Sequence, residues 1–259
     1  ELRARIARLT EEMERRRGGG RAQLYHVPKE GAGQVALVGP PNVGKSQLLA
    51  ALTDASPRIG PYPFTTQLPQ PAMMPFGNVQ VQLVDLPPVM DEGTPGWVRQ
   101  CLRYADLLML VVDLSVDPLS DLDTLRAVLG SMRIEPVGAD HEPESDDLLV
   151  RKRAVLVGNK LDQEDAAENL ELLEMENGGR LPLLAVSAVD GTGLEDLKRL
   201  LFERLGVIRV YTKPPGKEAN MEEPTVLKVG STVEDLAGLI HKELREKLRY
   251  GVLWGSGKF

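Results

Sequence analysis

One stretch of the chain combines glycines, a lysine and a hydroxyl group at a spacing that can hold phosphate groups. Residues 39–46 read GPPNVGKS, which fits the pattern G-x-x-x-x-G-K-S. The glycines let the loop wrap closely around phosphates, and its backbone N–H groups supply positive potential. Lys45 can then reach the β- and γ-phosphates, and Ser46 can offer its hydroxyl to Mg²⁺. A glycine-rich turn without a ligand would leave the Lys45–Ser46 pair unexplained. The residues assigned to this loop and its first helical turn are Gly39, Pro40, Pro41, Asn42, Val43, Gly44, Lys45, Ser46 and Gln47.

Two further positions could complete a site for Mg²⁺. Asp85 ends the apolar run VQVQLV and begins DLPP, where a carboxylate could hold the ion through water. By itself, an aspartate at a strand end is often only a cap, so this assignment depends on the phosphate loop. The segment YPFTT at 62–66 offers a hydroxyl that could bind Mg²⁺ and sense the γ-phosphate. We favour Thr66, with Thr65 as the alternate and an ordinary turn as the other interpretation.

The motif NKLD at 159–162 can select a purine base. The carboxylate of Asp162 could accept both N–H donors on the Watson–Crick edge of guanine, which adenine does not present. Loss of such a matched pair costs a few kcal/mol. Asn159 should tie this loop to the phosphate loop, and the stem of Lys160 can lie over the base. The segment SAV supplies small residues and backbone N–H groups near the guanine carbonyl, namely Ser187, Ala188 and Val189.

These motifs need a scaffold that brings strand ends together, and the hydrophobic pattern predicts one. From residue 33 onward, short apolar runs alternate with amphipathic patterns. This alternation indicates an α/β fold with right-handed crossovers and a mainly parallel sheet covered by helices on both faces. The predicted strands are GQVALVG, VQVQLVD, LLMLVVD, RAVLVGN and LPLLAVS, and helices are predicted at 95–104, 119–132, 163–175 and 193–205.

Changes in composition and hydrophobic pattern along the sequence predict three parts of the chain. Residues 1–31 read as an amphipathic helix with a glycine-rich hinge, 32–206 as the α/β domain, and 207–259 as a small α+β domain that is incomplete at its C-terminus. The last part is predicted to run strand, proline-rich loop, strand, helix, strand. Thr232 can cap this helix, and the apolar residues expected along one face of it are Leu236, Leu239, Ile240, Leu244 and Leu248.

Composition excludes several classes of protein. No stretch approaches the ~18 apolar residues of a membrane span, and the charged N-terminal segment does not fit a signal peptide, so a cytoplasmic protein is expected. The single cysteine, Cys101, cannot form an internal disulfide. A net charge of -7 argues against a whole-surface grip on nucleic acid. No DNA partner is therefore expected, although local basic patches could still contact RNA.

The motifs together resemble those of the Obg-related GTPases, most closely the developmentally regulated GTP-binding (DRG) branch. GPPNVGKS, YPFTT, DLPP, NKLD and SAV carry the resemblance, and the tail from RVYTKPPGK to YGVLWGSGKF looks like the β-grasp TGS domain of that branch. The resemblance implies a P-loop GTPase fold that binds GTP and GDP, with Mg²⁺-dependent hydrolysis acting as a conformational switch. It also implies an association with translation or the ribosome.

The same resemblance assigns roles to further residues and exposes two departures. Val89 stands where some GTPases have a water-orienting glutamine, so hydrolysis should be slow. Asn42 matches the asparagine that helps place K⁺ in potassium-activated relatives, and would join Lys45 and Thr66 in catalysis; the alternative is that it fits a tight turn. Pro88 replaces a glycine whose N–H would meet the γ-phosphate. Only 73 residues separate Asp85 and Asn159, so the inserted domain of DRG proteins is absent.

Two hypotheses remain open from sequence. One is an enzyme that switches with GTP hydrolysis and presents its TGS domain and N-terminal helix to a ribosome, an RNA or a protein partner. The other is a nucleotide-bound scaffold with negligible turnover. A weaker hypothesis makes the TGS domain an RNA-binding module, although the solvated face of an amphipathic helix is the favoured interpretation of its basic residues. Those residues are Lys242, Arg245, Lys247 and Arg249.

Overall fold

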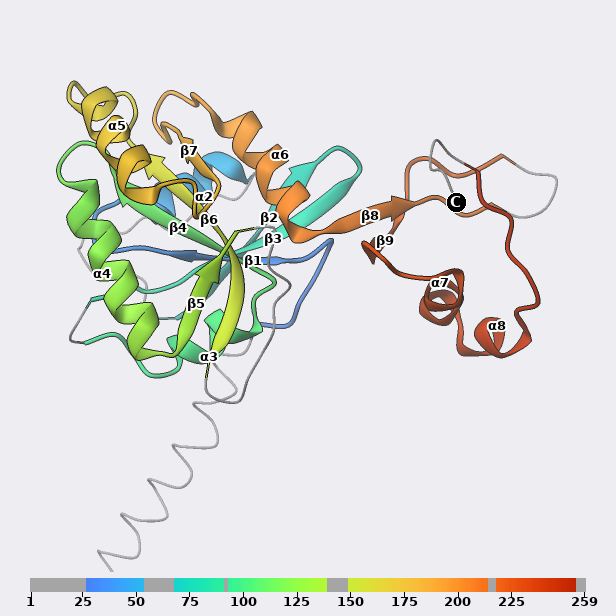
Figure 1. Cartoon of the computed structure of the whole chain (residues 1–259). Coiled ribbons are helices and arrows are strands. Elements are labelled where there is room, and N and C mark those ends of the chain that lie inside the picture. The colour runs from blue at the N-terminus through green and yellow to red at the C-terminus, as the bar shows by residue number, and fades with distance from the viewer. Residues whose placement is uncertain (1–26, 54–67, 91–92, 139–148, 214–217, 255–259) are drawn as a thin grey trace, which may run out of the picture. The chain divides into compact units, whose positions relative to one another are not determined.

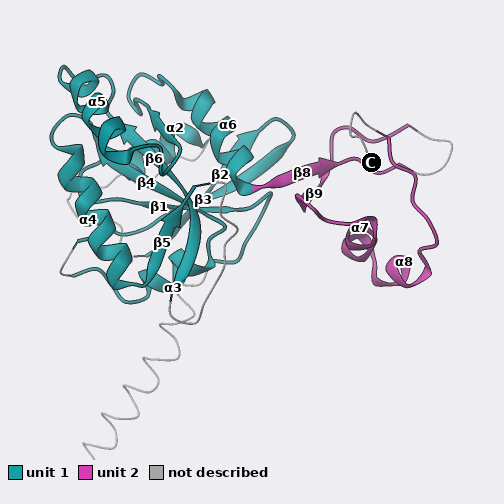
Figure 2. Ribbon diagram, in the orientation of Figure 1, with its two compact units in different colours: residues 1–205 teal, residues 206–259 magenta. Residues whose placement is uncertain are grey.

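The computed structural model describes residues 27–53, 68–90, 93–138, 149–213 and 218–254. The chain divides into two compact units, the first ending at Leu205 and the second beginning at Gly206 (Figure 2). The helix and hinge predicted for residues 1–26 lie outside the described residues, as does the segment YPFTT. The domain boundaries inferred from sequence remain a prediction.

A seven-stranded, mainly parallel sheet forms the centre of the first unit (Figure 1). The strand order is β2-β3-β1-β4-β6-β5, with β7 paired to the second half of β6. Every strand pair is parallel except β2 with β3. This confirms the predicted α/β fold class. The strands are β1 (Gln34–Val38), β2 (Gln70–Phe76), β3 (Val79–Asp85), β4 (Leu107–Asp113), β5 (Ile134–Val137), β6 (Val150–Asn159) and β7 (Leu183–Ala185).

Helices cover both faces of this sheet. Helices α3, α4 and α5 share one core cluster with alternate residues of β1, β4 and β6. Helices α2 and α6 contact each other and the strands, and their buried leucines lie outside that cluster, on the other face. The helices are α2 (Lys45–Leu52), α3 (Val98–Tyr104), α4 (Pro118–Ser131), α5 (Ala166–Asn177) and α6 (Leu194–Leu205).

Burial on both faces explains why the central strands read as continuous apolar runs. All residues of β1 and β4 are buried, as expected for parallel strands sandwiched between helices. The sequence did not predict β2 and β5, which contain Pro71, Pro75 and Pro136. Both are edge strands, where a missing N–H is tolerated. Their strand character therefore depends on position in the sheet more than on their own composition.

The second unit contains a two-stranded antiparallel pair and two short helices in its described residues. These are β8 (Val207–Val210), β9 (Thr225–Lys228), α7 (Val233–Ile240) and α8 (Lys242–Lys247). The predicted capping box is present: Thr232 and Asp235 exchange side-chain and backbone hydrogen bonds. The prediction of one helix through residue 248 was wrong, because His241 is extended, with φ −165°. No strand forms at residues 248–254 either, so the predicted final strand is not found there.

None of the helices within the described ranges has the length and apolar character that crossing a bilayer requires.

Candidate nucleotide-binding site

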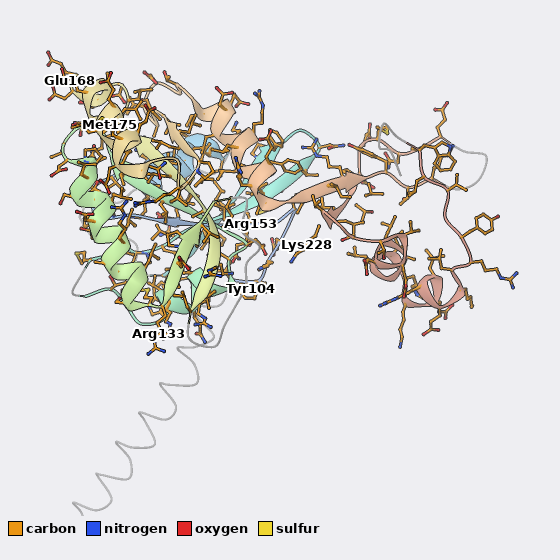
Figure 3. All side chains as sticks on the ribbon, in the orientation of Figure 1. Tyr104, Arg133, Arg153, Glu168, Met175 and Lys228 are labelled. Carbon is orange, nitrogen blue, oxygen red and sulfur yellow. The ribbon has the colours of Figure 1, made fainter. Side chains whose placement is uncertain are left out.

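The candidate site lies at the carboxyl edge of the parallel sheet, where ligands bind in folds of this class. The phosphate loop follows β1, Asp85 ends β3, Asp113 ends β4 and Asn159 ends β6. Arg133 immediately precedes β5 and marks the opposite, amino edge of the sheet, at the far end of the unit from α2 (Figure 3). Parallel pairing therefore brings motifs from distant parts of the sequence to one edge.

Close approaches require glycine at both ends of the phosphate loop. A Cβ atom on Gly39 would come within 2.5 Å of the Val111 carbonyl oxygen, and one on Gly44 would come within 2.4 Å of Asn159 Nδ2. Gly44 caps α2 with φ 87°, a conformation that other residues rarely adopt. Asn42 also has positive φ, 67°, which the tight-turn interpretation explains. The side chains of Asn42 and Gln47 are exposed.

Lys45 is buried inside the phosphate loop. Only 6% of the residue is exposed, and its ammonium donates to the carbonyl oxygens of Gly39 at 2.9 Å and Pro40 at 3.1 Å. Burial lowers the pKa of Lys45 to about 8, an effect that Asp85 and Asp121 oppose. The loop carbonyls compensate the ammonium only in part, and a polyphosphate would supply the anionic charge that such a buried cation needs.

Beside Lys45, the Ser46 hydroxyl and the Asp85 carboxylate lie in hydrogen-bond contact. Ser46 Oγ donates to Asp85 Oδ2 at 2.5 Å, and Asp85 is 1% exposed. Burial raises the pKa of Asp85, against the Ser46 hydrogen bond and the charge of Lys45. Asp85 Oδ1 is buried and has no hydrogen-bond partner among the described residues. A hydroxyl and an incompletely bonded carboxylate are ligands that Mg²⁺ accepts, directly or through water.

Asn159 joins the phosphate loop to the two base-site motifs. Its Nδ2 donates to the Val43 carbonyl at 2.9 Å, and its Oδ1 accepts from the Ala188 N–H at 3.2 Å. The residue is 1% exposed. One buried amide thus uses both its donor and its acceptor to hold three segments in register, which is the connection expected from the sequence.

Asp162 carries an exposed carboxylate that is held in place on both oxygens. Ser187 Oγ donates to Oδ1 at 2.6 Å and Gln163 Nε2 donates to Oδ2 at 2.5 Å. The Ser187 bond, followed by the Gln163 bond, lowers the pKa of Asp162. Ser187 Oγ also accepts from the Val189 N–H at 3.2 Å. The carboxylate therefore stays ionised at neutral pH as a fixed acceptor, facing solvent from which a base could enter.

The ammonium of Lys160 pairs with the carboxylate of Asp113. Sequence reasoning missed Asp113 and its neighbour Asp121, whose Oδ2 accepts from the Asp113 N–H at 2.8 Å. The signal was present, because LLMLVVD ends in aspartate as VQVQLVD does. What the sequence could not supply is the register that sets Asp113 beside Asn159 on the adjacent strand.

The segment after Asp85 is anchored to the phosphate loop. The Val89 N–H donates to the Gly39 carbonyl at 3.1 Å, and the Val89 side chain is completely buried in the core. Pro88 has no N–H to offer. Thr65 and Thr66, assigned to Mg²⁺ and γ-phosphate sensing, lie outside the described residues. The role predicted for the segment YPFTT therefore stays a prediction.

Comparison with known proteins decides the family. Residues 34–139 match the model of a 50S ribosome-binding GTPase, and residues 208–258 match the TGS domain. A GTP-binding protein from Methanocaldococcus jannaschii is 31% identical over 98% of this chain and 80% of that protein. Developmentally-regulated G-protein 1 from Arabidopsis thaliana is 27% identical over 99% of this chain and 78% of its own length. The chain belongs to the DRG family of GTP-binding proteins.

DRG-family membership agrees with the motifs and with the fold. Ribosome-interacting GTPase 1 from Saccharomyces cerevisiae is a further relative, 27% identical over 99% of this chain and 85% of that protein. The alignment with the archaeal relative runs over 315 positions although this chain has 259 residues. This DRG-family member therefore lacks residues that the relative has, as the short spacing between Asp85 and Asn159 indicates.

Solved structures show the fold alone. Era from Aquifex aeolicus bound to GDP and AlF4 superposes with a TM-score of 0.53 at 20% identity, covering 79% of this chain and 64% of Era. The matching domain models and the DRG relatives, rather than this superposition, make the chain a guanine-nucleotide-binding GTPase with a P-loop domain and a TGS domain. The assignment of individual residues to that binding is a proposal.

Proposed function

We propose that this DRG-family GTPase hydrolyses GTP slowly, in a Mg²⁺-dependent manner, as a conformational switch linked to the ribosome. The observation that carries the proposal is the arrangement at the sheet edge. The buried ammonium of Lys45, the Ser46 hydroxyl and the unpaired oxygen of Asp85 converge there, and Asn159 holds the base-site loops against the same phosphate loop.

In this proposal each group has a separate task. Lys45 and the loop N–H groups bind the phosphates, and Asp162 reads guanine while the Lys160 stem supports the base. Ser46 and Asp85 hold Mg²⁺, with Thr66 joining them in the GTP-bound state. When bound, Mg²⁺ neutralises charge on the phosphate oxygens. The small residues at 187–189 leave room beside the guanine carbonyl, but their N–H groups already donate within the protein, to the Thr192 carbonyl, Asn159 Oδ1 and Ser187 Oγ.

Two features near Asp85 support slow hydrolysis. The apolar Val89 side chain is buried in the core, so it cannot orient a water as a glutamine does in some GTPases. The Val89 N–H is already bonded to Gly39, and Pro88 provides none. We propose that K⁺, placed with the help of Asn42, supplies part of the missing stabilisation of developing negative charge.

The ribosome link draws on relatives and on the second unit. One relative is named a ribosome-interacting GTPase, and the matching domain is described as a 50S ribosome-binding GTPase. We propose that the TGS domain and the N-terminal segment present the partner surface. Direct RNA binding by α8 is less well supported, since Arg245 pairs with Glu234 at 2.9 Å and Lys247 with Glu243 at 3.4 Å.

A multiple-turnover GTPase assay in K⁺ or Na⁺, with and without ribosomes, tests the enzymatic part. We expect slow phosphate release that requires Mg²⁺ and is faster in K⁺ and with ribosomes. Lys45→Ala should abolish GDP binding and turnover, while Arg199→Ala, at an exposed position of α6 outside the site, should leave turnover unchanged within about twofold. Equal rates in K⁺ and Na⁺ would remove the role proposed for Asn42.

The alternative is a nucleotide-bound scaffold, in which Pro88 and the buried Val89 leave negligible turnover. In that case GDP and GTP bind, but no phosphate is released under any of these conditions. Binding without turnover would replace the switch by the scaffold, and would leave the nucleotide site itself intact.

A further inference from the structure

The ion pair between Asp113 and Lys160 connects the end of one central strand to the loop that follows its neighbour. The Asp113 side chain is 10% exposed and that of Lys160 is 29% exposed. Ion pairs at this depth are screened less than surface pairs. The two residues come from segments 47 positions apart, and Asp113 faces Asn159 in the parallel register of β4 and β6.

Asp113 is itself rigidly held. Its Oδ1 accepts from the Ser115 N–H at 2.8 Å and from Ser115 Oγ at 2.6 Å, so Oδ2 is the oxygen that meets Lys160. Its backbone N–H donates to Asp121 Oδ2 at 2.8 Å. A carboxylate fixed by this many bonds can act as an anchor for a flexible side chain.

The backbone on both sides of Lys160 is fixed as well. The Leu114 N–H donates to the Asn159 carbonyl at 2.9 Å, and the Leu161 N–H donates to the Val186 carbonyl at 3.0 Å. Lys160 has φ 70°, a conformation that persists in a non-glycine residue only where surrounding contacts hold it. With the backbone fixed and the ammonium bound to Asp113, the four-carbon stem has little freedom left.

We propose that Asp113 is a positioning residue for the guanine nucleotide, which holds the Lys160 stem in place before the base arrives. The inference rests on the role proposed above for Lys160 beside the base. A free lysine stem would lose rotamer entropy when a base packs on it. Anchoring the stem in advance removes this cost from binding, which is how preorganised sites gain affinity.

A double-mutant cycle on the full chain tests this inference, with release of fluorescently labelled GDP as the readout. Asp113→Asn removes the charge but keeps an acceptor, and Lys160→Met keeps a stem but removes the ammonium. Each should speed GDP dissociation about tenfold, because a freed stem must lose its rotamer entropy when the base packs on it and the complex is weaker by that amount. Because both act through one contact, the double variant should also dissociate about tenfold faster. A product of the two effects, about a hundredfold, would overturn the proposal.

Asp117→Asn is the matched control. Asp117 caps α4 through Leu119 N–H and Ser120 N–H, both at 3.1 Å, so its loss should leave GDP dissociation unchanged. If Asp113→Asn fails to fold, Lys160→Met decides alone, and unchanged dissociation in that variant overturns the anchoring role. Asp162→Asn distinguishes the proposed base site from the proposed positioning role of Asp113. If it weakens GDP binding while Asp113→Asn does not, the positioning role is wrong and the proposed base site stands.

Discussion

The carboxylate of Asp162 is fixed in place although it is exposed. Ser187 and Gln163 each donate to one of its oxygens, so its orientation does not depend on a bound base. A fixed acceptor loses little entropy when guanine binds, which favours selectivity. The bonds within the protein also hold it ionised, as the lowered pKa indicates.

Replacing Asp162 with asparagine should therefore change the preferred base. An amide presents a donor where the carboxylate presents an acceptor, so Asp162→Asn should mismatch guanine and match xanthine. We expect GDP affinity to fall by about two orders of magnitude and xanthosine diphosphate to bind instead. Isothermal titration calorimetry with both nucleotides measures the exchange. Asp123→Asn, the same substitution at an exposed position of α4, is the control and should keep guanine preference; an unchanged preference in Asp162→Asn would remove the proposed role.

The elements differ in how far the sequence could predict them. The runs LLMLVVD and RAVLVGN were predictable as strands because burial on both faces makes their central residues a continuous apolar run. Edge strands β2 and β5 were not, since their prolines fit only a position at the margin of a sheet. Helix α7 ends at Ile240 although apolar residues continue at helical spacing, because His241 turns the chain.

The residues of the candidate site also differ in how far the sequence could predict them. The phosphate loop and NKLD were predictable, because each motif encodes its chemistry within a few consecutive residues. Asp113 and the bond from the Val89 N–H to Gly39 were not. Both depend on which strands become neighbours, and a spacing in the sequence carries no such information.

The segment DLPP at 85–88 begins at the last residue of β3 and contains Pro88 where a glycine N–H would meet the γ-phosphate. Pro88→Gly restores an N–H and frees the backbone where the chain leaves β3. If the γ-phosphate is sensed there, the variant should bind a non-hydrolysable GTP analogue more tightly relative to GDP. We expect a shift of about ten- to a hundredfold, the value of one hydrogen bond between an N–H group and a charged acceptor. Competition binding against labelled GDP measures the ratio.

Pro87→Ala provides the control for that experiment. It also removes a proline from the segment, but it leaves Pro88 in place, so the ratio of the two affinities should stay as in the wild type. A ratio that rises equally in both variants would point to chain flexibility instead of the restored N–H.

At the scale of the whole molecule, the described site residues all belong to the first unit. The second unit has its own strand pair and its own helices. In the proposed function, the nucleotide binds the first unit and the partner binds the second. Nucleotide binding to the first unit changes the second unit only if a coupling free energy links the two. This coupling can be measured in the unsubstituted protein.

Hydrogen exchange with and without Mg²⁺ and GDP makes that measurement. A ligand present at 100 times its dissociation constant stabilises the state that binds it by about 2.7 kcal/mol. We expect slowly exchanging amides of β1, β4 and β6 to gain protection of that order, because global opening of the first unit must release the nucleotide. Amides of α7, whose N–H groups belong to the second unit, should not change. Equal added protection in α7 would mean that the two units unfold together. Nucleotide binding would then stabilise the TGS domain as well as the first unit.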